Sequence, residues 1–182
     1  GYCGQGVAQR LRGLGAHVTV VDTEPMAQLE AHLEGFNVAE KEEALVGADI
    51  VLTVTGRRNV ILEEHFELMK DGVLLCNAGA FEFEIDLSYL RDAAASIRNI
   101  RTDVERISMS DGKNYFLLGR GNSINLAGGD GNPIEVMDLG LALQALSLER
   151  LALGTDTLNN EPQTVPYDIE QTALKAAVKA WI

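Results

Sequence analysis

The first six residues, GYCGQG, have the composition of a phosphate-binding turn. Glycines let backbone N–H groups approach a pyrophosphate closely, and the positive end of a helix dipole stabilises the same anion. Residues 7–14 have the pattern of that helix, and Gly15 ends it. A predicted strand over residues 17–21 leads to Asp22, whose carboxylate can bind both hydroxyls of a ribose. This order of parts predicts a dinucleotide site that prefers NAD, because Asp22 would repel the 2′-phosphate of NADP.

The glycine fingerprint is incomplete in this sequence. Gly1, Gly4 and Gly6 correspond to its later glycines, whereas its first glycine and the strand before it are absent. A parallel sheet without its central first strand would be a poor domain, so we expect a fragment of a longer chain, cut within the phosphate-binding loop. The alternative is a surface turn before an ordinary amphipathic helix, since a glycine pattern alone is weak evidence.

Two apolar segments further along the chain predict strands buried on both faces. Residues 49–55, DIVLTVT, lead to Gly56, and residues 73–76 lead to Asn77-Ala78-Gly79. Ligands of open α/β sheets bind at the carboxyl ends of the strands. Residues 55–60 are therefore candidate cofactor-lining residues.

Helices and strands alternate through the first half of the chain, with glycines after each strand. This alternation predicts an α/β fold with a Rossmann-type doubly wound parallel sheet, present as a fragment that lacks its first strand. The other elements expected here are helices over residues 24–34, 41–46 and 63–69 and an edge strand over residues 36–38.

The next part of the chain is less regular. Five glycines within residues 119–131 predict a long, backbone-permissive loop, a kind that is often functional. The turn at residues 110–113 predicts a hairpin. We expect a helix over residues 85–95 that opens at Asp86, and strands over residues 97–101, 104–109 and 115–118.

A long helix over residues 133–153 is apolar almost all round. Such a helix is buried on more than one side, either in a core or against a subunit or domain partner, and both interpretations stay open. An amphipathic helix over residues 168–182, capped by Asp168, follows a linker over residues 159–166. We therefore predict a dinucleotide-binding domain over residues 1–153, and a linker with a C-terminal helix over residues 154–182.

Composition narrows the classes of function. With 182 residues, 46% hydrophobic and 23% charged, the chain has the composition of a globular domain. A net charge of −12 argues against a nucleic-acid partner. Cys3 and Cys76 are too few for a disulfide framework and lack metal-binding spacing, so we expect buried free thiols in the reducing cytoplasm. No segment approaches the roughly 20 apolar residues of a membrane span.

Several stretches of the chain share their order and spacing with one enzyme family. They include RGLGAHVTVVDTEP, TVTGRRNVI, HFELMKDGVLLCNAG, FEFEID, INL and GNPIEVMDL. On these stretches the sequence resembles the S-adenosylhomocysteine hydrolase family over nearly its whole length. The resemblance implies a two-domain α/β protein that forms tetramers, with a substrate domain drawn mostly from sequence N-terminal to Gly1. It also implies tightly held NAD and a small-molecule nucleoside substrate.

The chemistry implied by the resemblance begins and ends with NAD. The nucleoside 3′-hydroxyl is oxidised, the ketone acidifies the 4′ C–H, homocysteine leaves by elimination, water adds, and the ketone is reduced back. The cofactor-binding residues implied are Gly1, Tyr2, Cys3, Gly4, Gln5 and Gly6 at the pyrophosphate, Asp22 at the adenosine ribose, Thr55, Gly56 and Asn59 along the cofactor, Asn77, Ala78 and Gly79 near the nicotinamide, and Asn125 at the carboxamide end, with Asn132 in the same set.

Two positions depart from the family pattern. The family reads NxGHF and later GHPS, whereas this chain has Ala80 in the first motif, before Phe81, and Asn132 in the second. Both family histidines, which line the active-site cleft and its entrance, are thus replaced. Asn132 can hydrogen-bond but cannot shuttle protons at neutral pH. The family's C-terminal Lys and Tyr are also absent, and the histidines present are interpreted as structural or solvated, namely His17, His32 and His65.

These observations leave different classes of function open. One is a divergent enzyme that uses NAD for 3′-oxidation of a nucleoside thioether, with its general acid and base unassigned. Another is an NAD-holding paralogue that no longer turns over and instead regulates or scaffolds a partner. A dehydrogenase of the 2-hydroxyacid type shares this architecture, but its arginine and histidine pair is not apparent. We favour the enzyme, because the residues expected at the nicotinamide end are retained.

Overall fold

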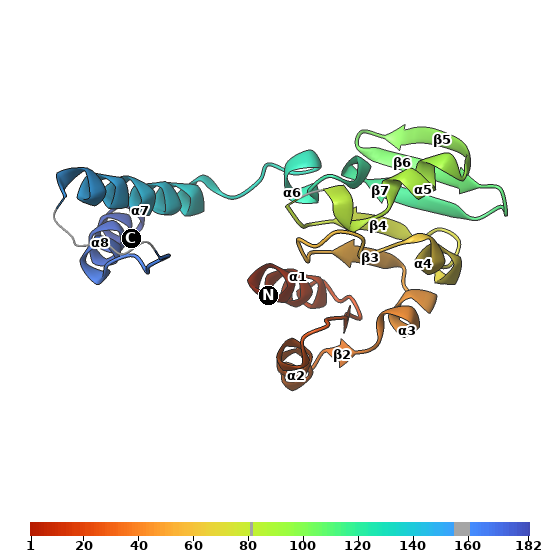
Figure 1. The fold of residues 1–182 in the computed structure, drawn as a ribbon, viewed down its shortest axis with the longest axis horizontal. Coiled ribbons are helices and arrows are strands. Elements are labelled where there is room, and N and C mark those ends of the chain that lie inside the picture. The colour runs from red at the N-terminus through yellow and green to blue at the C-terminus, as the bar shows by residue number, and fades with distance from the viewer. Residues whose placement is uncertain (81, 155–160) are drawn as a thin grey trace. The chain divides into compact units, whose positions relative to one another are not determined.

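The computed structural model describes residues 1–80, 82–154 and 161–182, and it has two compact units, residues 1–129 and residues 130–182 (Figure 1). The domain boundary expected after residue 153 falls inside the second unit and stays a prediction. Residues 155–160, where the expected linker begins, lie outside the described residues, as does Phe81.

The first helix begins earlier than its sequence pattern predicted. Helix α1 spans Tyr2–Gly13, with Gly1 as its N-cap and a backbone hydrogen bond from Gln5 N–H to the Gly1 carbonyl (3.0 Å). Gly4 and Gly6 therefore lie within the helix and not in a turn before it. Glycine is a weak helix former, but packing outweighs propensity, and the Gly4 position faces the Val54 side chain.

A small parallel sheet follows this helix. Strand β1 (Thr19–Val20) pairs with β2 (Asn37–Val38), and helix α2 (Pro25–Leu33) connects the two strands. Arg12 of α1 donates to the Glu34 carbonyl (2.7 Å) and lies over the Phe36 ring at 4.1 Å, a cation–π contact. These contacts hold α1 against the end of α2.

The larger sheet is mixed, with strand order β3-β4-β7-β6-β5. Its first three strands are parallel, as a doubly wound fold requires, and β6 forms antiparallel pairs with β7 and β5. The expected hairpin is therefore present. The helix expected over residues 85–95 is shorter, because Ala94 already pairs with Met109 in the sheet. The strands are β3 (Ile50–Thr53), β4 (Leu74–Asn77), β5 (Ala94–Arg101), β6 (Val104–Met109) and β7 (Asn114–Leu118).

The two sheets together have the strand sequence of a doubly wound fold with one position open. That fold has the strand order 3-2-1-4-5-6, counted along the chain. The pair β2-β1 matches its first two positions, and β3-β4-β7 matches its last three. In the described residues β1 and β3 do not pair with each other, and one strand between them would complete the order. These residues thus form a Rossmann-type domain fragment whose central strand position is open.

The core of the first unit lies between the larger sheet and three helices. Helices α3 (Lys41–Val46), α4 (Glu63–Leu68) and α5 (Leu87–Asp92) each bury one apolar side chain against the strands. Alternate strand residues point to this face, as the period of a strand dictates. The core residues from these elements are Leu45, Phe66 and Leu90 on the helices and Val51, Leu75, Ile107 and Leu117 on the strands.

Replacing Tyr115 by phenylalanine should lower the free energy of unfolding by about 1 kcal/mol. The Tyr115 hydroxyl is buried, and it donates to the Phe66 carbonyl at 2.8 Å. Its burial raises the pKa of this phenol to about 12. Denaturant unfolding of the intact protein measures the loss, and an unchanged midpoint would show that the hydroxyl contributes nothing.

The second unit is a pair of helices. Helix α7 (Ile134–Leu153) packs against α8 (Tyr167–Trp181), and Arg150 donates to the Asp168 carboxylate. This hydrogen bond from Arg150 lowers the pKa of Asp168. The expectation that Asp168 caps the helix is wrong, since the N-cap is Pro166 and Asp168 lies in the first turn, where its side chain binds Arg150 instead.

The long helix α7 has no fully buried residue within the described chain. Packing against α8 alone therefore does not bury α7 as a core helix would be buried. An additional partner for α7 stays a prediction. The large apolar side chains of α7 that are more than half exposed are Ile134, Val136, Leu141, Leu148, Leu151 and Leu153.

The expectation of two buried thiols holds for one cysteine. Cys76 is buried, and burial raises the pKa of its thiol to about 11. Cys3 is exposed, because it lies in the first turn of α1 on a face open to solvent. In the described parts of the chain, no helix is long and apolar enough to cross a membrane.

Candidate functional site

The parallel strands β3, β4 and β7 end at the same edge of the larger sheet. Thr55-Gly56 follows β3, and Ala78-Gly79 follows β4. An isolated parallel bridge joins Asn77 to Ser123, in the connection after β7. The structure therefore brings together three groups of predicted cofactor-binding residues, after β3, after β4 and around Asn125.

Asn77 fixes the end of β4 to its surroundings. Its side chain is fully buried and accepts hydrogen bonds from the Thr53 hydroxyl (3.3 Å) and the Gly79 N–H (2.8 Å). Its amide also donates to the Gly121 carbonyl (3.0 Å). Because this amide bonds inside the protein and Gly79 is buried, the half-buried Ala78 is the residue of this segment most open to a cofactor.

A second buried polar residue, Glu84, was missed by sequence reasoning. It ends a short 3-10 helix (Glu82–Glu84), and its side chain has no solvent exposure. The Thr55 N–H donates to both carboxylate oxygens (2.9 and 3.1 Å), the Thr55 hydroxyl donates at 2.9 Å, and the Gly56 N–H donates at 2.7 Å. The only sequence signal was the FEFEID stretch, which carried the family resemblance but no role for this residue.

The loop after β3 runs along the segment that contains Glu84. Asn59 has a left-handed backbone (φ 60°), and its N–H donates to the Phe83 carbonyl at 3.0 Å. The N–H groups of Val60 and Ile61 both donate to the Glu84 carbonyl, at 2.8 and 3.0 Å. Glu84 thus holds this loop through its backbone and the Thr55-Gly56 turn through its side chain.

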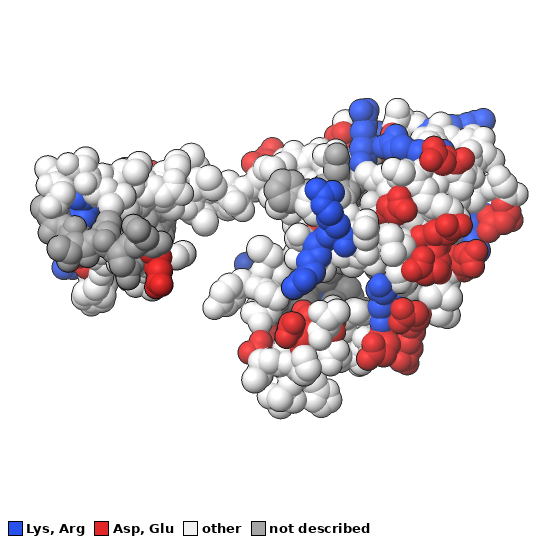
Figure 2. All heavy atoms as spheres, viewed as in Figure 1, with Lys and Arg blue, Asp and Glu red and all other residues white. Residues whose placement is uncertain are grey.

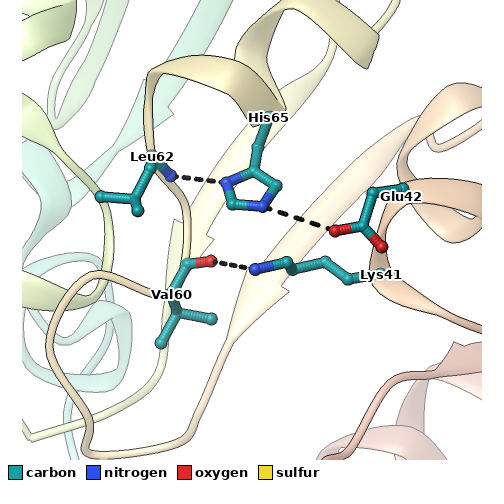
Figure 3. Close-up of polar contacts among 5 residues, drawn as sticks. All are labelled: Lys41, Glu42, Val60, Leu62 and His65. Carbon is teal, nitrogen blue, oxygen red and sulfur yellow. Dashed lines mark hydrogen bonds and ion pairs between the residues drawn. The ribbon is translucent and has the colours of Figure 1, made fainter.

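Helices α3 and α4 anchor the far end of the same loop (Figure 3). Lys41 donates to the Val60 carbonyl at 3.2 Å, and the Leu62 N–H donates to Nδ1 of His65 at 2.9 Å. Since Nδ1 accepts a hydrogen bond, the neutral ring carries its proton on Nε2, which lies 3.9 Å from the Glu42 carboxylate. This buried histidine is structural, as expected, whereas His17 and His32 are exposed.

The N-terminus of α1 is suited to an anion. Helix N-termini leave their first N–H groups without intrahelical partners, and this one has no side-chain cap and no acidic residue in its first turn. Tyr2, Cys3 and Gly6 are exposed, and Gln5 donates to the Glu30 carboxylate of α2 at 3.3 Å. The residues expected at a pyrophosphate therefore fit one. By contrast, acidic side chains cluster over α3 and α4 (Figure 2), where they occupy the first turn of each helix.

Asp22 lies just after β1, where the predicted ribose ligand should be. Its Oδ1 accepts a hydrogen bond from the Glu24 N–H (3.0 Å), and its carbonyl accepts one from the Gln28 amide (2.6 Å). The first bond orients the half-buried side chain, and the second holds the backbone at this position. In the described residues no donor binds Oδ2, so one oxygen is free to accept from a ribose hydroxyl.

The glycine-rich loop after β7 contains two short turns of helix. Gly119, Arg120 and Gly121 have left-handed backbones within a 3-10 turn (Gly119–Gly121), which leads to α6 (Ile124–Ala127). Asn125 lies in α6 with an exposed side chain that accepts from the Ser123 hydroxyl (2.6 Å). The predicted long loop thus contains two short helical segments, and it places Asn125 beside the end of β4.

The two positions that replace family histidines lie in different units. Ala80 follows Gly79 in the first unit and is exposed. Asn132 belongs to the second unit, where its amide donates to the Met137 sulfur at 3.7 Å. In the described residues, no group of three or more His, Cys, Asp or Glu side chains could hold a metal ion.

These parts together define a class of protein. A dinucleotide-binding domain of the Rossmann type has three such features. They are a helix N-terminus without acidic side chains, an acidic residue after the next strand, and turns at the ends of parallel strands. A family model described as "S-adenosyl-L-homocysteine hydrolase, NAD binding domain" matches residues 1–131. The chain therefore belongs to the S-adenosyl-L-homocysteine hydrolase family, and NAD is the cofactor of its binding domain.

Curated relatives agree with this membership. The chain is 39% identical to adenosylhomocysteinase of Nostoc sp. and 41% identical to that of Aquifex aeolicus, each over 99% of its length. It is 45% identical to S-inosyl-L-homocysteine hydrolase of Methanopyrus kandleri over 94% of its length. The matches cover 42%, 43% and 41% of these relatives, so the chain spans less than half of their length.

Proposed function

We propose that the intact protein hydrolyses a thioether of homocysteine and a nucleoside, in a reversible reaction that depends on tightly bound NAD. The observation that carries this proposal is the strand-end edge, with Thr55, Gly56, Ala78 and Gly79 side by side, in a chain of this family. NAD supplies a reversible two-electron oxidation of the nucleoside 3′-hydroxyl. The protein's task is to hold the cofactor and to move protons.

Different residues of this chain bind different parts of NAD. The N-terminal turn of α1, within residues 1–6, binds the pyrophosphate through the N–H groups that precede Gln5, and Asp22 accepts from the adenosine ribose. The turns around Thr55, with Asn59 beyond it, line the cofactor. The segment of residues 77–79 lies at the nicotinamide end, where Asn77 and Gly79 hold the turn and Ala78 is the most open residue.

One polar residue of the first unit completes the proposed cofactor site. Asn125 carries an exposed amide in α6, beside the end of β4, and can bind the carboxamide. Asn132 lies in the second unit, and its assignment to the cofactor rests on the family resemblance alone and stays a prediction.

The substrate class is a nucleoside thioether whose nucleobase is either adenine or hypoxanthine. Relatives at similar identity are named for adenosyl and for inosyl substrates. This chain holds the cofactor half of such proteins, so residues that distinguish adenine from hypoxanthine belong to the substrate domain that the resemblance implies. S-adenosylhomocysteine and S-inosylhomocysteine are therefore the two substrates to compare.

A non-hydrolytic NAD-binding paralogue is the second candidate function. It is favoured by Ala80 and Asn132, which cannot titrate near neutrality where the family has histidines. Such a protein would keep NAD and regulate or scaffold a partner. Incubating the intact protein with each thioether separates the two functions. Homocysteine release supports the enzyme, whereas bound NAD with no release and no NADH from any nucleoside supports the paralogue.

We further propose that the protein is a cytoplasmic homo-oligomer, a tetramer by family resemblance, with α7 near a subunit contact. Light scattering on the intact protein should give several times the mass of one chain, because the apolar side chains of α7 need a partner. Leu148→Glu should reduce that mass by placing a charge among them. Glu149→Gln, on the same helix and also exposed, is the control. A monomer in the unmodified protein would contradict the proposal.

A further inference from the structure

We propose that Glu84 is a positioning residue for NAD, whose buried carboxylate shapes the two strand-end turns that receive the cofactor. The inference rests on the proposed function, since it assigns the support of the same edge. Glu84 is distinct from the residues predicted to touch NAD. It lies beneath the turns after β3 and β4, with no solvent exposure.

The carboxylate acts on the first turn through four hydrogen bonds. Three donors, the N–H groups of Thr55 and Gly56 and the Thr55 hydroxyl, lie within 2.7 to 3.1 Å of its two oxygens. In the described residues, no Lys, Arg or His forms an ion pair with Glu84, so backbone dipoles take the place of a cation. Hydrogen bonds to an ionised acceptor are about twice as strong as neutral ones. The turn is therefore set before any cofactor arrives.

The binding role of this turn changes as a result. Successive N–H groups in such a turn form an anion-binding nest, and Gly56 has the left-handed backbone (φ 67°) that builds one. Here the protein's own carboxylate fills the nest. Thr55 and Gly56 therefore cannot offer these N–H groups to a phosphate, and they present a fixed backbone shape to the cofactor.

The same carboxylate sets the second turn through close packing. A Cβ added at Gly79 would lie 1.7 Å from the Glu84 Oε1 and 2.8 Å from its carboxyl carbon, so only glycine fits. The Asn77 side chain, which accepts from the Gly79 N–H, closes the other side of this contact. Glu84 thus spaces the β4 turn from the β3 turn.

Glu84→Gln tests the role of the carboxylate, because it keeps the size and replaces one acceptor oxygen with a donor that faces N–H groups. In the intact protein, NAD should bind roughly tenfold to hundredfold more weakly by calorimetry, the loss expected for a charged hydrogen-bond network. Hydrogen exchange at the amides of Thr55 and Gly56 should speed up in the free protein. Tyr115→Phe is the matched control, since it loses a buried hydrogen bond elsewhere and should leave NAD affinity unchanged.

Two results would overturn the assignment. One is NAD affinity equal to that of the unmodified protein in Glu84→Gln, and the other is an equal loss in Tyr115→Phe, which would make the effect one of general stability. Failure of the unmodified protein to bind NAD would instead contradict the proposed function. The two failures are therefore distinguishable.

Gly79→Ala alone keeps the assignment falsifiable if Glu84→Gln does not fold, and a double-mutant cycle with Glu84→Ala tests the shared contact directly. Gly79→Ala should weaken NAD binding, because its methyl group displaces the carboxylate. In a Glu84→Ala background that methyl group has room, so Gly79→Ala should cost less there than in the unmodified protein. Additive effects of the two substitutions on NAD affinity would contradict the shared contact.

Discussion

Placing histidine at both Ala80 and Asn132 should raise homocysteine release from S-adenosylhomocysteine by the intact protein by at least roughly 100-fold. Proton transfer to the hydroxyl, the leaving sulfur and water needs groups that titrate near neutrality, and each is typically worth about 100- to 10,000-fold in rate. Alanine supplies no such group, and the Asn132 amide cannot change its charge. The oxidation step depends on NAD binding, so bound NADH should form with a nucleoside even in the unmodified protein.

The assay for this prediction measures homocysteine and the absorbance of bound NADH together. The double substitution of the same positions by glutamine is the matched control, because glutamine is polar and similar in size but does not titrate. Fast release by the unmodified protein would show that the histidines are dispensable. An equal gain with glutamine would show that bulk, and not proton transfer, limits the reaction.

The intact protein should bind NAD more tightly than NADP by on the order of 100-fold or more. The Asp22 carboxylate lies at the end of β1 with one oxygen free to accept, and a 2′-phosphate at that place would meet its charge. Repulsion between two such charges in a partly buried site costs on the order of a few kcal/mol. Asp22→Asn should narrow the preference by weakening NAD and relieving NADP.

Calorimetric titration of both cofactors measures this preference. Glu24→Gln is the control, because Glu24 is a neighbouring exposed acid whose side chain is not assigned to the ribose. Equal affinities for NAD and NADP in the unmodified protein would remove Asp22 from the site. A change with Glu24→Gln as large as that with Asp22→Asn would reduce the effect to general surface charge.

The sequence predicted the elements whose signal is local. The apolar run of β3, the Asp111-Gly112 turn between β6 and β7 and the bounds of α3 are present as expected. The predicted start of α1 was wrong, because we took the glycines of residues 1–6 as a sign of a turn. Packing of the helix outweighs their low helix propensity. The cap at Asp168 was wrong because its carboxylate binds Arg150, a contact 18 residues away that no local pattern reveals.

The candidate site was predictable in its positions but not in its support. Strand ends followed by glycines located Thr55, Gly56 and Gly79, since that pattern is regular in α/β folds. The role of Glu84 was not predicted, because an acidic residue in FEFEID is expected to be exposed to solvent. Only the fold shows that its carboxylate binds the turn after β3. The assignment of residues to NAD itself stays a prediction.

The most direct test of the central claim is to denature the purified intact protein and identify the nucleotide that it releases. We predict about one NAD per subunit, with Asp22 and the α1 N-terminus as its ligands. Release of NADP in place of NAD, or of no nicotinamide nucleotide from a protein that also fails to bind added NAD, would contradict the account.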